Sequence, residues 1–379
     1  GIGSRRSLAL AVVSVLGSAA LLRAQEVGAP TAEDGAVPSP ADSIECAAKG
    51  LLRYEPPPLP ECALVVFVHV PKTGGTTLRM WFESQAEAGE WEYHQVGVPP
   101  HPQSPGRSEH EWLYWLNGLK TDAAFLKEHP RLLLEVHGGD GTGIPEVLMG
   151  GIDSLRSPGS VFHEAGCKAG VTTLVRQPHR FYLSNMHDEY RHSWYRQTFL
   201  KRMHEQGVCL QQDNSCDGAY MQHAEWHQTV PEWAPDLVDM EIKEFHNYAG
   251  GGRALQRVDA KAEPEHLERV WDWVLKVDVV GTTVGLDELM FRLSKDFGFQ
   301  QLTHKVVGAG TRKPTPEWAE HEAKLVGAVE AASALDAELF KRTEELLARK
   351  RAVASEQEQC ELAAFLRAEG VHVDHTSHD

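Results

Sequence analysis

The stretch PKTGGTT, residues 71–77, combines residue types that bind phosphate groups. Lys72 supplies a positive charge that suits a phosphate oxygen. Gly74 and Gly75 let the backbone approach a ligand closely. The stretch also holds hydroxyl donors: Thr73, Thr76 and Thr77.

The segments on either side of this stretch predict a strand, a tight turn and a helix. ALVVFVHV, residues 63–70, is a continuous apolar run typical of a central parallel strand. TTLRMWFESQAEA follows with helical spacing. The N-terminus of such a helix points backbone N–H groups and its positive dipole end at an anion. The loop is not the common nucleotide-binding loop G-x-x-x-x-G-K-[ST], because its lysine precedes both glycines.

A second phosphate-binding pattern occurs in TLVRQPHRFYLSNM, residues 173–186. Arg176 stands at the carboxyl end of a predicted strand, where a guanidinium can hold a phosphate bidentately. Ser184 follows about two helical turns later and offers a hydroxyl to the same group. The alternative is that Arg176 forms a surface ion pair.

The two motifs together resemble those of the Golgi carbohydrate sulfotransferases, such as the heparan sulfate 2-O- and 6-O-sulfotransferases. FVHVPKTGGTTL is similar to the family's 5′-phosphosulfate loop, and TLVRQPHRFYLSNM to its 3′-phosphate segment, with Gln177 in place of the usual acidic residue. Weaker similarity extends the resemblance over residues 63–352. It implies that 3′-phosphoadenosine 5′-phosphosulfate (PAPS) is the sulfuryl donor. Arg312 and Lys313 resemble a late loop that closes over the nucleotide.

The resemblance also implies a histidine or glutamate base and a leaving-group role for Lys72, with no metal. We favour His137 as the base, since it ends a predicted strand where open α/β sheets place their ligands. Histidine also titrates near neutral pH. Glu135 is the alternative, and His69 is predicted to be structural.

The implied activity is carbohydrate O-sulfotransfer to a glycan hydroxyl, with an anionic, heparan sulfate-like polysaccharide as one candidate acceptor. The basic run from Arg180 to Arg202 either lines the acceptor cleft or forms a solvated helix face. Two other functions stay open. They are a catalytically silent glycan-binding protein of the same fold and a nucleotide kinase or NTPase.

Composition narrows the class of partner and the compartment. A formal net charge of −17 argues against non-specific nucleic-acid binding, which needs a basic surface. The six cysteines suit an oxidising lumen. Cys46 with Cys62, and Cys209 with Cys216, are candidates for small disulfides, although sequence alone leaves the pairing open.

An apolar run of about 16 residues, SLALAVVSVLGSAALL, follows two arginines near the start of the sequence. It predicts either a cleaved signal peptide or a short signal-anchor, with a buried helix as the third alternative. With the resemblance, the expected location is the Golgi membrane as a single-pass type II protein with a lumenal catalytic domain. A secreted protein is expected if the segment is cleaved.

Strands alternating with helices predict an α/β protein, a P-loop-like three-layer fold with a mainly parallel central sheet flanked by helices. We predict a signal segment at residues 1–24, a Pro/Ala-rich stem at 25–62, the sulfotransferase domain at 63–352 and a disordered tail at 353–379. Residues 89–106 are predicted to be a loop-rich insert.

Overall fold

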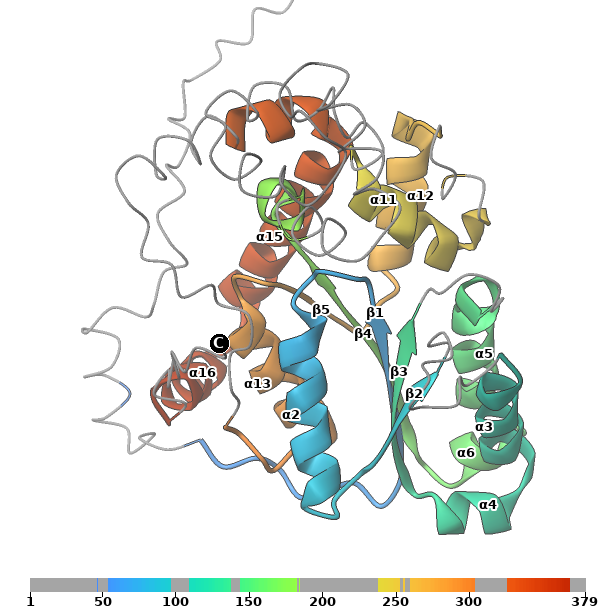
Figure 1. The fold of residues 1–379 in the computed structure, drawn as a ribbon. Helices are drawn as coiled ribbons and strands as arrows, with labels where there is room; N and C mark the ends of the chain where they lie inside the picture. The colour runs from blue at the N-terminus through green and yellow to red at the C-terminus, as the bar shows by residue number, and fades with distance from the viewer. Residues whose placement is uncertain are drawn as a thin grey trace, which may run out of the picture. The chain divides into compact units, whose positions relative to one another are not determined.

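The computed structural model describes residues 46, 54–96, 109–137, 144–182, 184, 238–252, 255, 260–303 and 326–368. Their centre is a five-stranded sheet in the order β2-β3-β1-β4-β5 (Figure 1). The strands are β1 (Ala63–His69), β2 (Glu92–Val96), β3 (Arg131–His137), β4 (Lys168–Val175) and β5 (Val279–Thr282). All neighbouring pairs are parallel, which confirms the predicted α/β fold.

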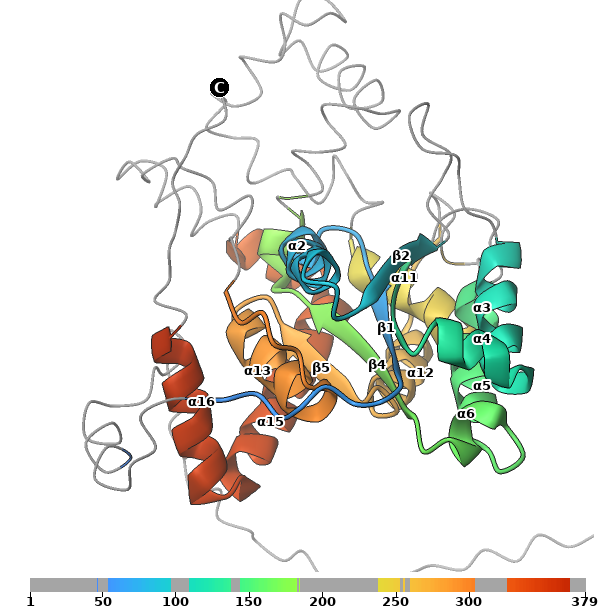
Figure 2. The same ribbon diagram turned by 90° about the horizontal axis from the view of Figure 1, so that it is seen from below.

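Helices cover both faces of the sheet (Figure 2). They are α2 (Gly75–Glu87), α3 (Glu109–Thr121), α4 (Ala123–Glu128), α5 (Ile144–Arg156), α6 (Val161–Glu164), α11 (Met240–His246), α12 (Pro264–Val274), α13 (Leu286–Phe297), α15 (Ala334–Val353) and α16 (Glu356–Ala368). A π-helical turn, η2 (Asn247–Gly251), follows α11.

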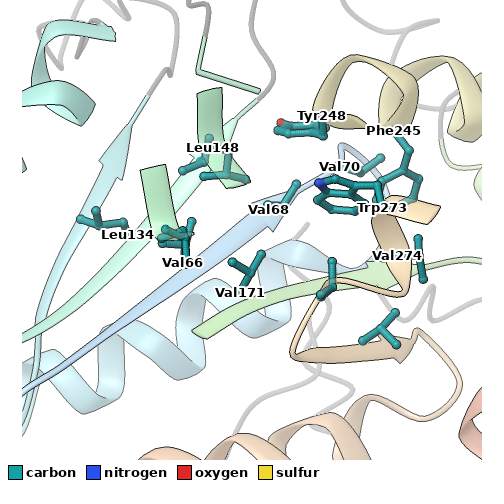
Figure 3. Close-up of a cluster of buried hydrophobic side chains, with 14 of the residues drawn as sticks. Val66, Val68, Val70, Leu134, Leu148, Val171, Phe245, Tyr248, Trp273 and Val274 are labelled. Carbon is teal, nitrogen blue, oxygen red and sulfur yellow. The ribbon is translucent and has the colours of Figure 1, made fainter. Parts of the chain in front are cut away.

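Alternation along β1 divides the apolar side chains between two cores. Leu64, Val66 and Val68 face one core together with side chains of α3, α5, α11, α12 and α15 (Figure 3). Val65 and Phe67 face the other core, which α2, α13 and α16 complete. Because β1 is buried on both faces, a continuous apolar run is what its position requires.

Three predictions about segments of the chain need correction. The loop-rich insert contains β2, a short edge strand whose polar sequence EYHQV carries little strand signal. The tail predicted to be disordered from residue 353 contains α16, in which Phe365 is fully buried. Part of the predicted stem also packs on the domain, since Tyr54 lies against Phe291 and Phe365.

The long C-terminal helix has a buried and an exposed side. α15 buries Leu339 and Leu347, and its exposed side carries i,i+4 ion pairs. Arg342 lies 2.9 Å from Glu338, and Lys341 lies 4.0 Å from Glu345. No described helix is long and apolar enough to cross a membrane, and the apolar run near the start lies outside the described residues.

The disulfides join distant parts of the chain. Cys62 pairs with Cys167 and Cys46 with Cys360, so the candidate pair Cys46–Cys62 is wrong. Cys62 precedes β1 and Cys167 precedes β4, and these neighbouring parallel strands bring the two sulfurs together. Cys209 and Cys216 lie outside the described residues.

Replacing Cys46 and Cys360 together by alanine should lower the free energy of unfolding by about 2–4 kcal/mol. The reason is that this bond constrains the unfolded chain across a sequence separation of 314 residues. Urea unfolding followed by tryptophan fluorescence measures the change. Peptide mapping without reductant is the control, and a peptide linking Cys46 to Cys62 would contradict the pairing.

Candidate functional site

The 71–77 loop leaves β1 and enters α2 through two left-handed backbone positions. Lys72 has φ +66° and Gly74 has φ +86°. A lysine in this region is strained, so the surrounding contacts must hold it there. The Thr73 hydroxyl donates to the Val70 carbonyl at 2.8 Å, which closes the turn from inside.

The N-terminus of α2 has two features that suit an anion. Gly74 occupies the N-cap position without a side-chain hydrogen bond, and the first turn carries no acidic residue. The first N–H groups of a helix have no partner within the helix, and the positive dipole end adds to their attraction for negative charge. Thr76 is exposed at this end and Thr77 is buried.

Arg176 joins the second predicted motif to the loop. It follows β4, the neighbour of β1, and its Nη1 donates to the Lys72 carbonyl at 2.5 Å. Its backbone N–H donates to Glu241 Oε1 at 2.8 Å. Burial lowers the pKa of Arg176, but a guanidinium stays protonated in proteins. The guanidinium is therefore a cation fixed beside the loop.

Glu241 reaches Arg176 because hydrogen bonds join the start of α11 to the start of α15. Asp336 accepts hydrogen bonds from the backbone N–H groups of Glu241 and Ile242. Asp239 in turn accepts from those of Leu335 and Asp336. Each helix start is capped by an aspartate of the other element, which holds Glu241 in place behind Arg176.

Several buried polar atoms around Arg176 lack a hydrogen-bond partner among the described residues. They include Arg176 Nε, His179 Nδ1 and Thr283 Oγ1, together with two acceptors, Gln177 Oε1 and Glu241 Oε2. Thr283 touches the loop, since its Cγ2 lies 2.9 Å from where a Cβ on Gly74 would stand. Its N–H donates to the Val175 carbonyl at 3.0 Å. Leaving such groups unpaired costs about 1–3 kcal/mol each, so a ligand rich in acceptors fits this place.

His179 adds a neutral ring to this group. Burial, together with the charges of Arg180 and Arg176, lowers its pKa to about 4. Its Nδ1 is 3.9 Å from Glu330 Oε1, too far for a hydrogen bond. At neutral pH this histidine is therefore an uncharged neighbour of the two arginines.

The carboxyl ends of β1 and β3 carry a second group of polar side chains around one buried carboxylate. We call it the Glu135 cluster: His69, Arg79, Tyr93, Glu135 and His137. Glu135 is fully buried, and the other members each hydrogen-bond to it. Its members come from β1, α2, β2 and β3, so four elements meet at this carboxylate.

Distances within the Glu135 cluster are short. His69 Nδ1 and His137 Nε2 each lie 2.5 Å from Glu135 Oε1. Arg79 donates to both carboxylate oxygens, from Nη2 to Oε1 at 2.7 Å and from Nε to Oε2 at 3.0 Å. The Tyr93 hydroxyl donates to Oε2.

These donors decide the charge of Glu135. Burial alone would raise its pKa, but the hydrogen bonds from His137, His69 and Arg79 outweigh burial and hold the pKa well below its usual range. Glu135 is therefore ionised and accepts hydrogen bonds from its neighbours. Burial and the Glu135 charge raise the pKa of Tyr93, which keeps its phenol protonated as a donor.

An ionised Glu135 sets the tautomer that we assign to His137. Nε2 lies 2.5 Å from the ionised carboxylate and 3.0 Å from Arg79 Nη2, which can only donate. The shorter contact, with the charged acceptor, assigns the proton to Nε2. Nδ1 is then the basic nitrogen of a half-buried ring. This pairing of a histidine with an orienting carboxylate is the arrangement of a general base.

The Glu135 cluster and the loop touch each other through His69. His69 pairs with His137 across β1 and β3, with ring centroids 4.4 Å apart. On its other side, a Cβ on Gly75 would stand 2.1 Å from His69 Nε2. The phosphate-type loop and the candidate base therefore belong to one site.

His69, Glu135 and His137 also form a possible metal-ligand set, with ligand atoms within 4.8 Å of one another. Arg79 Nη2, however, lies 2.7 Å from Glu135 Oε1 and 3.0 Å from His137 Nε2. A guanidinium thus takes the position that a metal ion would need, and the cluster does not fit a metal.

The structure brings together most of the residues predicted from sequence. Lys72, the rest of the loop, Arg176, His137 and Glu135 lie around the carboxyl ends of β1, β3 and β4. Ser184 is helical and partly buried, and no hydrogen bond between described residues joins it to Arg176. Arg312, Lys313 and the run after Ser184 to Arg202 lie outside the described residues.

Sequence reasoning missed Arg79, Tyr93, Thr283 and Glu241. Arg79 carries a usable signal, because it stands four residues after Gly75 and so faces the same side of the helix. Tyr93 carries no such signal, because the sequence predicts residues 89–106 to be a loop-rich insert. Thr283 and Glu241 reach the site only through the packing of β5 and α11.

No protein-family model matches the chain, and no curated protein matches it. Function must therefore be argued from the geometry of this site.

Replacing Arg79 by methionine should lower the free energy of unfolding at pH 7 by about 3–5 kcal/mol, because a buried carboxylate loses its cation. The depressed pKa of Glu135 stabilises the fold above the usual carboxyl range, and this stability is lost as pH falls. The difference between the two proteins should therefore shrink in acid. Urea unfolding from pH 7 to about pH 2 measures it, because the loss begins only below the usual carboxyl range.

Arg351→Met is the matched control, since Arg351 pairs with Glu288 and Glu344 at an exposed position. It should cost about 1 kcal/mol or less. Equal losses in the two variants would show that Arg79 does not neutralise a buried charge.

Proposed function

We propose that this protein is a PAPS-dependent carbohydrate O-sulfotransferase. One observation carries the proposal: Arg176 Nη1 donates to the Lys72 carbonyl, although the two residues are 104 positions apart. A loop suited to one phosphate and an arginine suited to another thus lie side by side. PAPS carries phosphate at both its 5′ and 3′ positions, whereas ATP carries phosphate only on the 5′ side.

The 5′-phosphosulfate of PAPS would bind residues 72–77, at the open N-terminus of α2. The 3′-phosphate would bind Arg176 and Ser184. The unpartnered Arg176 Nε and Thr283 Oγ1 support a ligand with many acceptors at this place. Arg312 and Lys313 would close over the nucleotide, as the family resemblance implies.

In the proposed reaction, the acceptor hydroxyl attacks sulfur while its proton passes to His137 Nδ1. An O–S bond to the sugar forms as the S–O bond to the 5′-phosphate breaks. The products are the sulfate ester and 3′,5′-ADP. Lys72 would stabilise the charge on the leaving phosphate oxygen.

Glu135, the alternative base, is better suited to a positioning role. Its two oxygens already accept hydrogen bonds from four side chains, and its depressed pKa makes it a weak proton acceptor. The role left for Glu135 is to accept the hydrogen bond from the Nε2–H of His137. This arrangement supports His137 as the base and Glu135 as the group that orients it.

The acceptor would be a sugar hydroxyl, with an anionic polysaccharide as one candidate. The Golgi lumen suits this chemistry, and the disulfides Cys46–Cys360 and Cys62–Cys167 fit an oxidising compartment. A membrane anchor in the N-terminal apolar run belongs to the same proposal.

The protein should bind 3′,5′-ADP, and Arg176→Gln should weaken this binding about 10- to 100-fold by removing a charged hydrogen bond to the 3′-phosphate. Binding of 5′-AMP, which lacks that phosphate, should weaken less than binding of 3′,5′-ADP, because Arg176 reaches the 5′ loop only through the Lys72 carbonyl. Isothermal titration calorimetry measures both.

Arg131→Gln is the matched control, since Arg131 also donates to backbone carbonyls but lies at the other end of the sheet. It should leave both affinities unchanged. Tight binding of Mg²⁺-ATP without binding of 3′,5′-ADP would overturn the proposal in favour of a nucleotide kinase or NTPase.

His137→Ala should lower kcat for sulfate transfer by about 10²- to 10⁴-fold, because the acceptor hydroxyl loses its general base. Its affinity for 3′,5′-ADP should stay within about twofold of the unchanged protein. Transfer from labelled PAPS to a panel of glycans measures the rate. Full activity of the variant would exclude His137 as base, and nucleotide binding without transfer by the unchanged protein would indicate a silent glycan-binding protein.

A further inference from the structure

We propose that His69 is a positioning residue that ties the phosphate loop to the base, acting on His137 through the shared carboxylate of Glu135. The inference rests on the proposed function and deepens it. Sequence reasoning assigned His69 only a structural role. Its contacts on three sides give it a more specific one.

The first contact is with Glu135. His69 is the last residue of β1 and is buried, and its Nδ1 lies 2.5 Å from Glu135 Oε1. Because Glu135 is ionised, Nδ1 carries the proton and donates. Burial lowers the pKa of His69, more than its bond to Glu135 raises it, so the ring is neutral and has one N–H.

The second contact is with His137. Both histidines donate to the same oxygen, Glu135 Oε1, and each donor nitrogen lies 2.5 Å from it. Their rings are 4.4 Å apart, so neither can rotate without meeting the other. His69 thereby fixes where Oε1 lies, and Oε1 fixes which nitrogen of His137 carries the proton.

The third contact is with the loop. The His69 ring fills the place that a side chain at residue 75 would take, with Nε2, Cδ2 and Cε1 all within 2.6 Å of that Cβ position. Gly75 is the first residue of α2, where the phosphate group is proposed to bind. His69 therefore spans the distance between the anion site and the base.

This arrangement predicts a role beyond filling space. The Nδ1–H of His69 should hold Oε1 in line with His137 Nε2, so that His137 keeps Nδ1 free for the acceptor proton. Without that donor, only Arg79 Nη2 holds Oε1 beside His137. The carboxylate of Glu135 can then turn toward Tyr93 and Arg79 Nε, which bind Oε2. Loss of the donor would therefore slow the chemical step and leave nucleotide binding unchanged.

The test compares His69→Leu, which removes the donor, with His69→Asn, whose amide nitrogen takes the place of Nδ1. His69→Leu should lower kcat about 10- to 100-fold while the affinity for 3′,5′-ADP stays within about twofold. His69→Asn should recover at least half of the lost activity on a logarithmic scale. His129→Leu is the matched control, because His129 Nδ1 also donates to a carboxylate, that of Glu92, at 2.7 Å.

A readout independent of activity is the tautomer of His137. Long-range ¹H–¹⁵N spectra of protein labelled in its histidines, with the His137 signals assigned from His137→Gln, should show a proton on Nε2. In His69→Leu these signals should move toward a mixture of tautomers, and in His69→Asn they should return.

Unchanged His137 signals and unchanged kcat in His69→Leu would overturn the inference. Equal losses in the leucine and asparagine variants would overturn it as well, because size alone would then matter. If the unchanged protein transfers no sulfate but the tautomer shift is present, the positioning role stands and the proposed function fails.

Discussion

A single buried negative charge organises the functional end of this fold. Glu135 has no exposed surface, and an ionised carboxylate in such a place is costly unless it is fully bonded. Its partners come from β1, β2, β3 and α2, and each must reach the same two oxygens. The requirement to satisfy this charge therefore fixes the relative positions of three strands and α2.

The same constraint extends to the phosphate loop. His69 bonds to Glu135 on one side and fills the side-chain space of Gly75 on the other. The loop is held a second time from β4, where Arg176 donates to the Lys72 carbonyl. A strained backbone conformation such as that of Lys72 persists only when surrounding contacts hold it. The contacts of His69 and Arg176 with the loop do so.

The sequence predicts the parts of the site whose signals are local. The buried run of β1, the glycines of the loop and an arginine at a strand end are all readable in short windows. β2 was missed because an edge strand with the sequence EYHQV lacks an apolar pattern, and Tyr93 was missed with it. α16 was missed because its polar sequence hides the burial of Cys360 and Phe365. The Glu135 cluster draws on four separate elements, so only the folded chain brings it together.

The two arginines of the site show how an acidic chain keeps a cation available. The charge of Arg79 is compensated, because both oxygens of the ionised Glu135 accept hydrogen bonds from its guanidinium. Arg176 instead bonds to the neutral carbonyl of Lys72. The carboxyl group behind it belongs to Glu241, and burial together with Asp336 raises the pKa of Glu241 well above its usual value. This pKa shift favours the neutral form of Glu241, so burial reduces the negative charge behind Arg176. The less that carboxyl group offsets the guanidinium, the more of the Arg176 charge is left for a phosphate group.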